Sequence, residues 1–180
     1  MSYTPFSLCP SDSDVAEALI LRGFDPSHEA TKFTTYKTEL DLPIPQLMQI
    51  AKSAKSVLRL GVDIGGGTGT FAATMKLYNV TVVTTTMNVA APYSEAVALR
   101  GLVPLHVPLQ DVDRVLRGGG YMWVDHFFSK GADLEKTYGP LIGKLGYKKV
   151  KWATANKTDA GGLKNGEVYL TALLQKPVSR

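Results

Sequence analysis

Three glycines at alternating positions constrain this chain more than any other feature of its 180 residues. Gly65, Gly67 and Gly69 follow the apolar run VLRLGVDI (57–64) and precede TFAATMKLYN (70–79), which has helical composition. Glycine adopts positive φ easily and lets the backbone approach a ligand closely. The start of a helix adds unpaired N–H groups and a positive potential. The sequence therefore predicts a strand, a glycine loop and a helix that form a nest for a nucleotide-like ligand.

The glycine spacing separates this loop from two common phosphate-binding loops. A P-loop needs a lysine directly after its last glycine, and no lysine follows here until Lys76. The dinucleotide fingerprint G-x-G-x-x-G needs glycine at position 70, where the chain has Thr70. The remaining pattern, D-x-G-x-G-x-G from Asp63 to Gly69, is typical of the S-adenosylmethionine loop of class I methyltransferases. A tight turn without a ligand is the alternative interpretation.

Beyond the loop, short apolar segments alternate with helical ones. Strands are expected over residues 57–64, 80–87, 102–109, 121–128, 147–155 and 167–175, with helices over residues 92–101, 111–117 and 132–146 between them. This alternation predicts an α/β sheet that starts parallel and ends in an antiparallel hairpin. The continuous apolar run at 57–64 is typical of a strand buried on both faces. Pro104 and Pro108 favour an edge position for the third strand.

The first part of the chain has a different character. Residues 1–42 are rich in turn formers, with one helix expected near residues 12–22, and a second helix is expected over residues 43–56. The predicted organisation is a helical extension at 1–56 followed by a sheet domain at 57–180. The N-terminal sequence has no basic and apolar signal pattern, and no run of about 18 apolar residues occurs, so a cytoplasmic location without membrane spans is expected.

Charge and metal-ligand types exclude several other classes. The net charge is +4, and its basic excess is spread along the chain, so a nucleic-acid partner is not expected. Cys9 is the single cysteine, which excludes an internal disulfide and a cysteine-based zinc site. His28 and His106 lie far from each other and from Cys9, and no metal site is expected.

From about Leu60 onward the chain resembles plant class I S-adenosylmethionine-dependent methyltransferase-like proteins. The segments GVDIGGGTGTFAA, DVDRVLRGGGYMWVDHFF and YLTALLQKP carry this resemblance. It implies a Rossmann-like sheet, S-adenosylmethionine as cofactor and a methyl acceptor that the sequence does not identify. The resemblance assigns cofactor binding to the loop residues Asp63, Gly65, Gly66, Gly67 and Gly69 and, at the end of the second strand, to Thr86 and Asn88. A hydroxyl or amide at this ribose position binds more weakly than the usual carboxylate.

One segment of the family pattern is missing. Class I methyltransferases usually have a further strand and helix before the R-V-L-x-P-G-G turn, whereas here Gln110 runs directly into Asp111. The predicted sheet therefore lacks one central strand. Either the segment at 121–128 takes its place beside the first strand, or the first strand keeps an open edge. An open edge favours pairing with a second copy of the chain.

The chemistry beyond cofactor binding rests on Asp125 and His126 at the end of a predicted strand. Histidine titrates near physiological pH, so it is the candidate general base for methyl transfer. The alternative interpretation is a pair that only bonds locally. The predicted function is methyl transfer from S-adenosylmethionine. Because the missing segment normally helps to bind substrate, the alternative is a catalytically degenerate relative that acts as a binding, regulatory or protein-interaction module.

Overall fold

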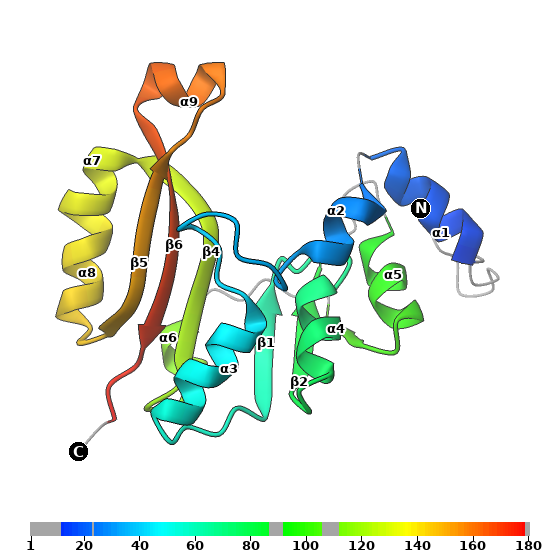
Figure 1. Ribbon diagram of the computed structural model, residues 1–180, viewed down its shortest axis with the longest axis horizontal. Helices are drawn as coiled ribbons and strands as arrows, with labels where there is room; N and C mark the ends of the chain where they lie inside the picture. The colour runs from blue at the N-terminus through cyan, green and yellow to red at the C-terminus, as the bar shows by residue number, and fades with distance from the viewer. Residues whose placement is uncertain (1–11, 23, 87–91, 106–111, 179–180) are drawn as a thin grey trace. The chain divides into compact units, whose positions relative to one another are not determined.

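The computed structural model describes residues 12–22, 24–86, 92–105 and 112–178, which form a mixed α/β fold (Figure 1). The chain divides into two compact units. Unit 1 comprises residues 1–34 and 44–110, and unit 2 comprises residues 35–43 and 111–180. The α/β class expected from the sequence is confirmed, whereas the division at residue 56 stays a prediction.

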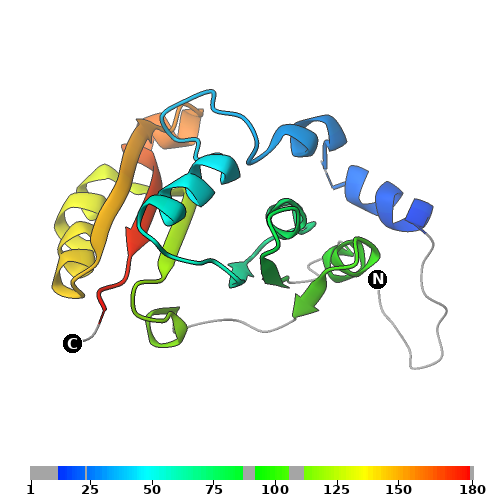
Figure 2. The same cartoon turned by 60° about the horizontal axis from the view of Figure 1, so that its bottom comes forward.

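Unit 1 is built on a parallel sheet with the strand order β1-β2-β3. Its strands are β1 (Leu60–Ile64), β2 (Thr81–Thr85) and β3 (Val103–Leu105). The connecting helices α4 (Thr70–Lys76) and α5 (Tyr93–Leu99) lie on the same side of this sheet (Figure 2). The third strand lies at the sheet edge, as Pro104 predicted, while Pro108 lies outside the described residues.

Three further helices precede the sheet in unit 1. They are α1 (Asp12–Ile20), α2 (Pro26–Thr31) and α3 (Ile44–Ser53). The sequence patterns predicted α1 and α3 but not the short α2, which begins where the Asp25 carboxylate accepts the Ser27 N–H at 2.9 Å. In α1, Val15 and Leu19 pack against Ala96 of α5. Helix α1 thus shares a core with α5, one of the helices that connect the parallel strands.

Unit 2 is an antiparallel sheet with the order β4-β6-β5, which confirms the predicted antiparallel end of the fold. Its elements are β4 (Tyr121–Lys130), β5 (Lys148–Asn156), β6 (Glu167–Gln175), α6 (Val112–Val115), α9 (Ala160–Asn165) and a helical stretch made of α7 (Gly131–Asp133), η1 (Leu134–Tyr138) and α8 (Gly139–Lys144). That stretch covers one face of the sheet (Figure 1), where Leu134 packs with Leu170 and Leu174 of β6.

The first strand differs from its prediction. Leu60, Val62 and Ile64 are 74%, 48% and 50% exposed, so burial on both faces is wrong for β1. In the parallel register these side chains share a sheet face with Val103 and Leu105, which are also exposed. An apolar run predicts a strand, but the second face of that strand is buried only if another element of the chain packs against it. Among the described residues of unit 1, no helix covers this face.

The missing strand leaves a visible consequence in the strand pairing. Within the described part of the chain, β4 pairs with β6 alone, and β1 pairs with β2 alone. The expected pairing of segment 121–128 with the first strand is therefore not formed, and β1 has no second partner strand among the described residues. The junction between Gln110 and Asp111 itself lies outside the described residues.

Tyr147 provides a test of the unit 2 core. Its hydroxyl donates to the Asp113 carboxylate at 2.8 Å, and burial together with this bond raises the pKa of Tyr147 to about 12. Because this pKa lies above the ordinary value of 10, the stabilisation is complete below pH 10 and is lost as the pH rises towards 12. We expect Tyr147→Phe to cost about 1 kcal/mol at pH 7 and to lose less stability than the wild type between pH 10 and 12. Urea unfolding at pH 7 and between pH 10 and 12 measures the free energy of unfolding of both proteins. If the two proteins lost the same free energy between pH 10 and 12, the raised pKa of Tyr147 would be contradicted.

Candidate functional site

The glycine loop curls over the carboxyl end of β2. Gly65, Gly67 and Gly69 all have positive φ, at 70°, 56° and 78°. The Gly65 N–H donates to the Thr85 hydroxyl and the Gly66 N–H to the Thr85 carbonyl, both at 3.1 Å. The loop then closes on itself, because the Gly69 N–H donates to the Gly66 carbonyl at 2.9 Å. The backbone conformation that the sequence predicted for these glycines is therefore present.

Asp63 lies directly beneath this loop. It stands opposite Thr84 in the parallel register, and both side chains point at Gly66. A Cβ added at Gly66 would lie 2.1 Å from the Asp63 Oδ2 atom and 2.6 Å from the Thr84 Cγ2 atom. Only glycine fits between the loop and the carboxylate, so the structure gives a steric reason for the second glycine of the GGG run.

The outer side of the loop is open. A Cβ added at Gly65 or Gly67 would meet no atom within 4 Å, so the bare backbone faces space that a ligand can occupy. A carboxylate held near such a backbone can pair with an ammonium, while exposed N–H groups suit a ligand carboxylate. The loop and Asp63 together can accept a ligand that carries both an ammonium and a carboxylate.

The predicted ribose position is only partly described. Thr86 follows β2 directly and is 3% exposed. Its hydroxyl lies 2.7 Å from the Ser94 hydroxyl of α5, and its N–H donates to the Leu105 carbonyl at 3.1 Å. A hydroxyl has one donor and two acceptor sites, so a bond to Ser94 leaves capacity for a second partner. Asn88 lies outside the described residues.

A polar network that the sequence did not predict fixes the start of α4. The Thr70 hydroxyl donates to the Glu29 carboxylate at 2.5 Å, and Arg100 Nη1 donates to the same hydroxyl at 3.1 Å. Arg100 also donates to the Thr68 carbonyl at 3.0 Å. Glu29 stands 41 positions before Thr70, so no local spacing could have indicated this contact. The network links α2 and the end of α5 to the last turn of the glycine loop.

Asp125 and His126 lie in unit 2, at an irregularity in β4. Val124 pairs with Ala172 and Phe127 with Leu170, so two residues of β4 stand opposite the single Thr171. This is a β-bulge, and His126 has a φ of 47°, which is unusual for a residue other than glycine. Its N–H donates to the Thr171 hydroxyl at 3.3 Å. Bulges commonly re-aim a side chain beside an active site.

The two side chains form a hydrogen-bonded pair. His126 Nδ1 lies 3.0 Å from Asp125 Oδ1, and the side chains are 44% and 30% exposed. Since the carboxylate accepts, the hydrogen-bond pattern assigns the proton to Nδ1 and leaves Nε2 with a lone pair. The arrangement can act as a general base whose tautomer is set by the neighbouring carboxylate.

The described residues contain neither a metal-ligand cluster nor a membrane-spanning helix. In the described ranges no group of three or more His, Cys, Asp and Glu residues could hold a metal ion. Cys9 and His106 lie outside those ranges. None of the helices in the described part is long and apolar enough to span a membrane.

A parallel sheet with a glycine loop after its first strand, followed by an antiparallel end, is a Rossmann-like class I methyltransferase fold. Two solved structures of StiE O-MT share it, with TM-scores of 0.51 and 0.50 at 12% and 14% identity. They match 90% and 73% of this chain over 81% and 74% of their own. No family model matches.

A closer relative is a probable methyltransferase of Arabidopsis thaliana, which is 52% identical over 262 residues covering all of this chain and 68% of the relative. The chain therefore belongs to the plant class I methyltransferase-like family. The match spans 262 residues against 180 here, so at least 82 positions (262 − 180) have no residue of this chain opposite them. This difference agrees with the loss of an internal segment that the sequence pattern predicted.

Proposed function

We propose that this chain is a methyltransferase with S-adenosylmethionine as its methyl donor. The observation that carries the proposal is the left-handed glycine loop over Asp63, in a chain of a methyltransferase family. When bound, S-adenosylmethionine supplies a methyl group made electrophilic by its sulfonium. The catalytically degenerate alternative gains no support from the comparisons. A cytoplasmic location stays a prediction.

The chain's own groups have distinct parts in binding the donor. The Asp63 carboxylate pairs with the ligand ammonium from beneath the loop. The backbone N–H of Gly67 receives the ligand carboxylate where the loop faces open space, while the bond from Gly65 to Thr85 holds the loop in shape. Thr86, with Asn88, contacts the ribose hydroxyls. The Glu29, Thr70 and Arg100 contacts hold the start of α4, directly after the loop.

Proton removal is the part of the reaction that we assign to unit 2. His126 Nε2 accepts the proton that an acceptor hydroxyl or amine gives up as it takes the methyl group. Asp125 holds Nδ1–H and stabilises the positive charge that the imidazole gains. The bulge at Thr171 supports this role, because it turns His126 out of the regular strand pattern.

The variant His126→Gly separates this chemical role from folding. Glycine relieves the positive φ of 47°, so we expect the melting temperature to hold or to rise by about 2–4 °C. Loss of a general base should lower turnover by about 100-fold or more, with the affinity for S-adenosylmethionine unchanged. Turnover is followed as S-adenosylhomocysteine released from S-adenosylmethionine over a panel of hydroxyl, amine and carboxyl acceptors. If the variant kept the full turnover of the wild type, His126 would not be the general base and its bond to Asp125 would be only structural. Donor binding without release over the panel would favour the degenerate alternative.

We also propose that two copies of the chain associate through the edge of β1. The strand has an unpaired edge among the described residues, and beside it Leu60, Val62 and Ile64 are exposed. Paired edges satisfy backbone groups, and the adjoining apolar side chains gain burial in a second copy. We expect light scattering to show a dimer of about 39 kDa, twice the 19.5 kDa chain. Val62→Lys should shift it to the monomer, with Val178→Lys, an exposed valine of unit 2, as control. A wild-type monomer at 100 μM would contradict this interface.

A further inference from the structure

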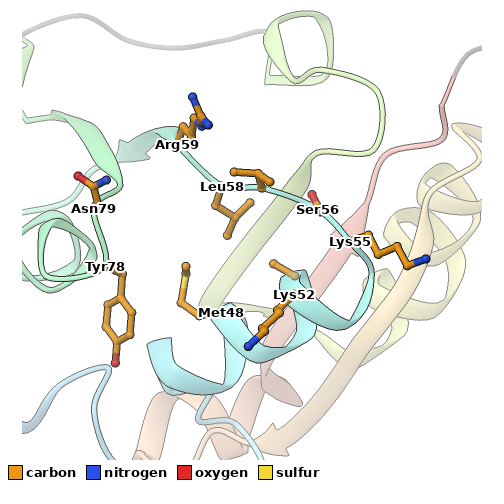
Figure 3. A pocket seen from close by; sticks show the side chains of 10 residues that line it. Met48, Lys52, Lys55, Ser56, Leu58, Arg59, Tyr78 and Asn79 are labelled. Atoms are coloured by element: carbon orange, nitrogen blue, oxygen red, sulfur yellow. The ribbon is translucent and has the colours of Figure 1, made fainter.

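Unit 1 contains a cleft that the methyl-transfer proposal does not use. It has a volume of about 710 Å³ and lies between the end of α3, the segment 55–59 before β1, and the turn after α4. Met48 and Leu58 lie on facing sides of it (Figure 3). Ala51 and Val57 also belong to its apolar lining. Pockets for small organic molecules commonly have volumes of about 300–1,000 Å³.

The rim of this cleft is positively charged. Lys52, Lys55 and Arg59 extend from its edges (Figure 3), and none of the ten residues that line it is acidic. Among the described residues, no carboxylate forms an ion pair with these three side chains. The helices α3 and α4 both end here, and each C-terminus contributes about half a negative charge at most. The three positive side chains outweigh the partial negative charges of the two helix ends, so the cleft attracts anions.

The backbone at Lys55 adds an independent observation. Lys55 follows α3 with a φ of 53°, a position where helices usually have glycine. The Lys55 N–H donates to the Lys52 carbonyl and the Ser56 N–H to the Ala51 carbonyl, both at 2.9 Å, so the turn itself is a regular helix end. A lysine in this conformation destabilises the fold relative to glycine. The lysine side chain places a positive charge at the rim of the cleft, which a glycine at this position would lack.

The cleft is distinct from the donor site. Its residues 55–59 precede the first residue of β1, whereas the glycine loop follows the last. Five residues of extended strand separate the two by roughly 15 Å. A ligand in this cleft therefore lies at the opposite end of β1 from the glycine loop.

We propose that this cleft binds an amphiphilic organic anion, a small molecule with a carboxylate, sulfonate or phosphate group beside an aromatic or aliphatic body. The apolar part packs between Met48 and Leu58, with the Tyr78 ring at the margin, and the anionic group pairs with Lys52, Lys55 or Arg59. The site is a binding site separate from catalysis, and the inference does not depend on methyl transfer.

The test uses the full chain labelled with ¹⁵N and amide chemical shifts at 150 mM NaCl. The probe is 1-naphthalenesulfonate, compared with 1-naphthalenemethanol, 1-naphthylmethylammonium and inorganic phosphate. We expect saturable shifts centred on residues 48–59 and 78–79 with the sulfonate. The neutral and cationic analogues and phosphate alone should bind at least tenfold more weakly, because each lacks one of the two recognised parts.

Two variants connect the probe to the named residues. Lys52→Glu with Arg59→Glu should weaken sulfonate binding at least tenfold, whereas the control Arg22→Glu with Lys148→Glu changes net charge equally and should leave it unchanged. Lys55→Gly should raise the melting temperature by about 2–4 °C and still weaken binding at least threefold. Equal binding by the charge-reversed pair, shifts centred elsewhere, or equal affinity for the ammonium analogue would each overturn the proposal. So would tighter binding of a single-stranded oligonucleotide at the same residues.

Discussion

Gly66→Ala should abolish binding of S-adenosylmethionine and lower the free energy of unfolding by about 3 kcal/mol. The added Cβ would lie 2.1 Å from the Asp63 carboxylate and 2.6 Å from Thr84, so the loop must lift or both strands must shift. Thr84 is fully buried, which leaves the strands little room to yield. Urea unfolding and calorimetric titration measure the two effects separately.

Gly143→Ala is the matched control for this substitution. Gly143 lies in α8, has no positive φ, and a Cβ added there would meet no atom within 4 Å. Alanine favours a helix over glycine, so we expect a gain of about 0.5–1 kcal/mol and unchanged donor binding. A Gly66→Ala protein that bound the donor as tightly as Gly143→Ala would show that the loop does not form the site.

Asp63→Asn should weaken binding of S-adenosylmethionine by about 30-fold while the protein stays folded. Asparagine has nearly the same shape, so it fits beneath Gly66, but it removes the negative charge that pairs with the ligand ammonium. At such a site, a hydrogen bond to a charged carboxylate contributes about 2 kcal/mol more to binding than a hydrogen bond to a neutral amide. Titration of the variant with S-adenosylmethionine gives the affinity ratio, and far-ultraviolet circular dichroism checks the fold.

Glu17→Gln in α1 is the charge control, because it removes one exposed negative charge outside the glycine loop. It should bind the donor as the wild type does. If Asp63→Asn bound equally well, the carboxylate would have a structural role under the loop rather than a role in ligand recognition.

Local chemistry made the conformation of the glycine loop predictable. Alternating glycines between an apolar run and a helical segment specify a backbone with positive φ, and the structure has it at Gly65, Gly67 and Gly69. The same holds for β6, because the strand-like segment after the turn-rich TDAGGLKNG predicted the bounds 167–175 that the structure has. Both features depend on residues that are neighbours in the chain.

Long-range contacts were out of reach for the same reason. The Glu29–Thr70 bond joins residues 41 positions apart, and the bulge that turns His126 arises from its pairing with β6. The prediction that both faces of β1 are buried was wrong, because no described element of unit 1 covers the face that carries Leu60, Val62 and Ile64. Segment 35–43 shows the same limit, since its place in unit 2 comes from contacts such as Lys151 Nζ with the Asp41 carbonyl at 2.7 Å.

Calorimetric titration of the wild-type chain with S-adenosylmethionine and S-adenosylhomocysteine tests the central claim most directly. Measurements at 10 and 30 °C avoid a false negative, because the heat-capacity change of binding prevents the heat from vanishing at both temperatures. We predict one saturable site per chain, with a dissociation constant below about 100 μM for each ligand. No detectable heat at millimolar ligand at either temperature would contradict the assignment of the glycine loop as a donor site.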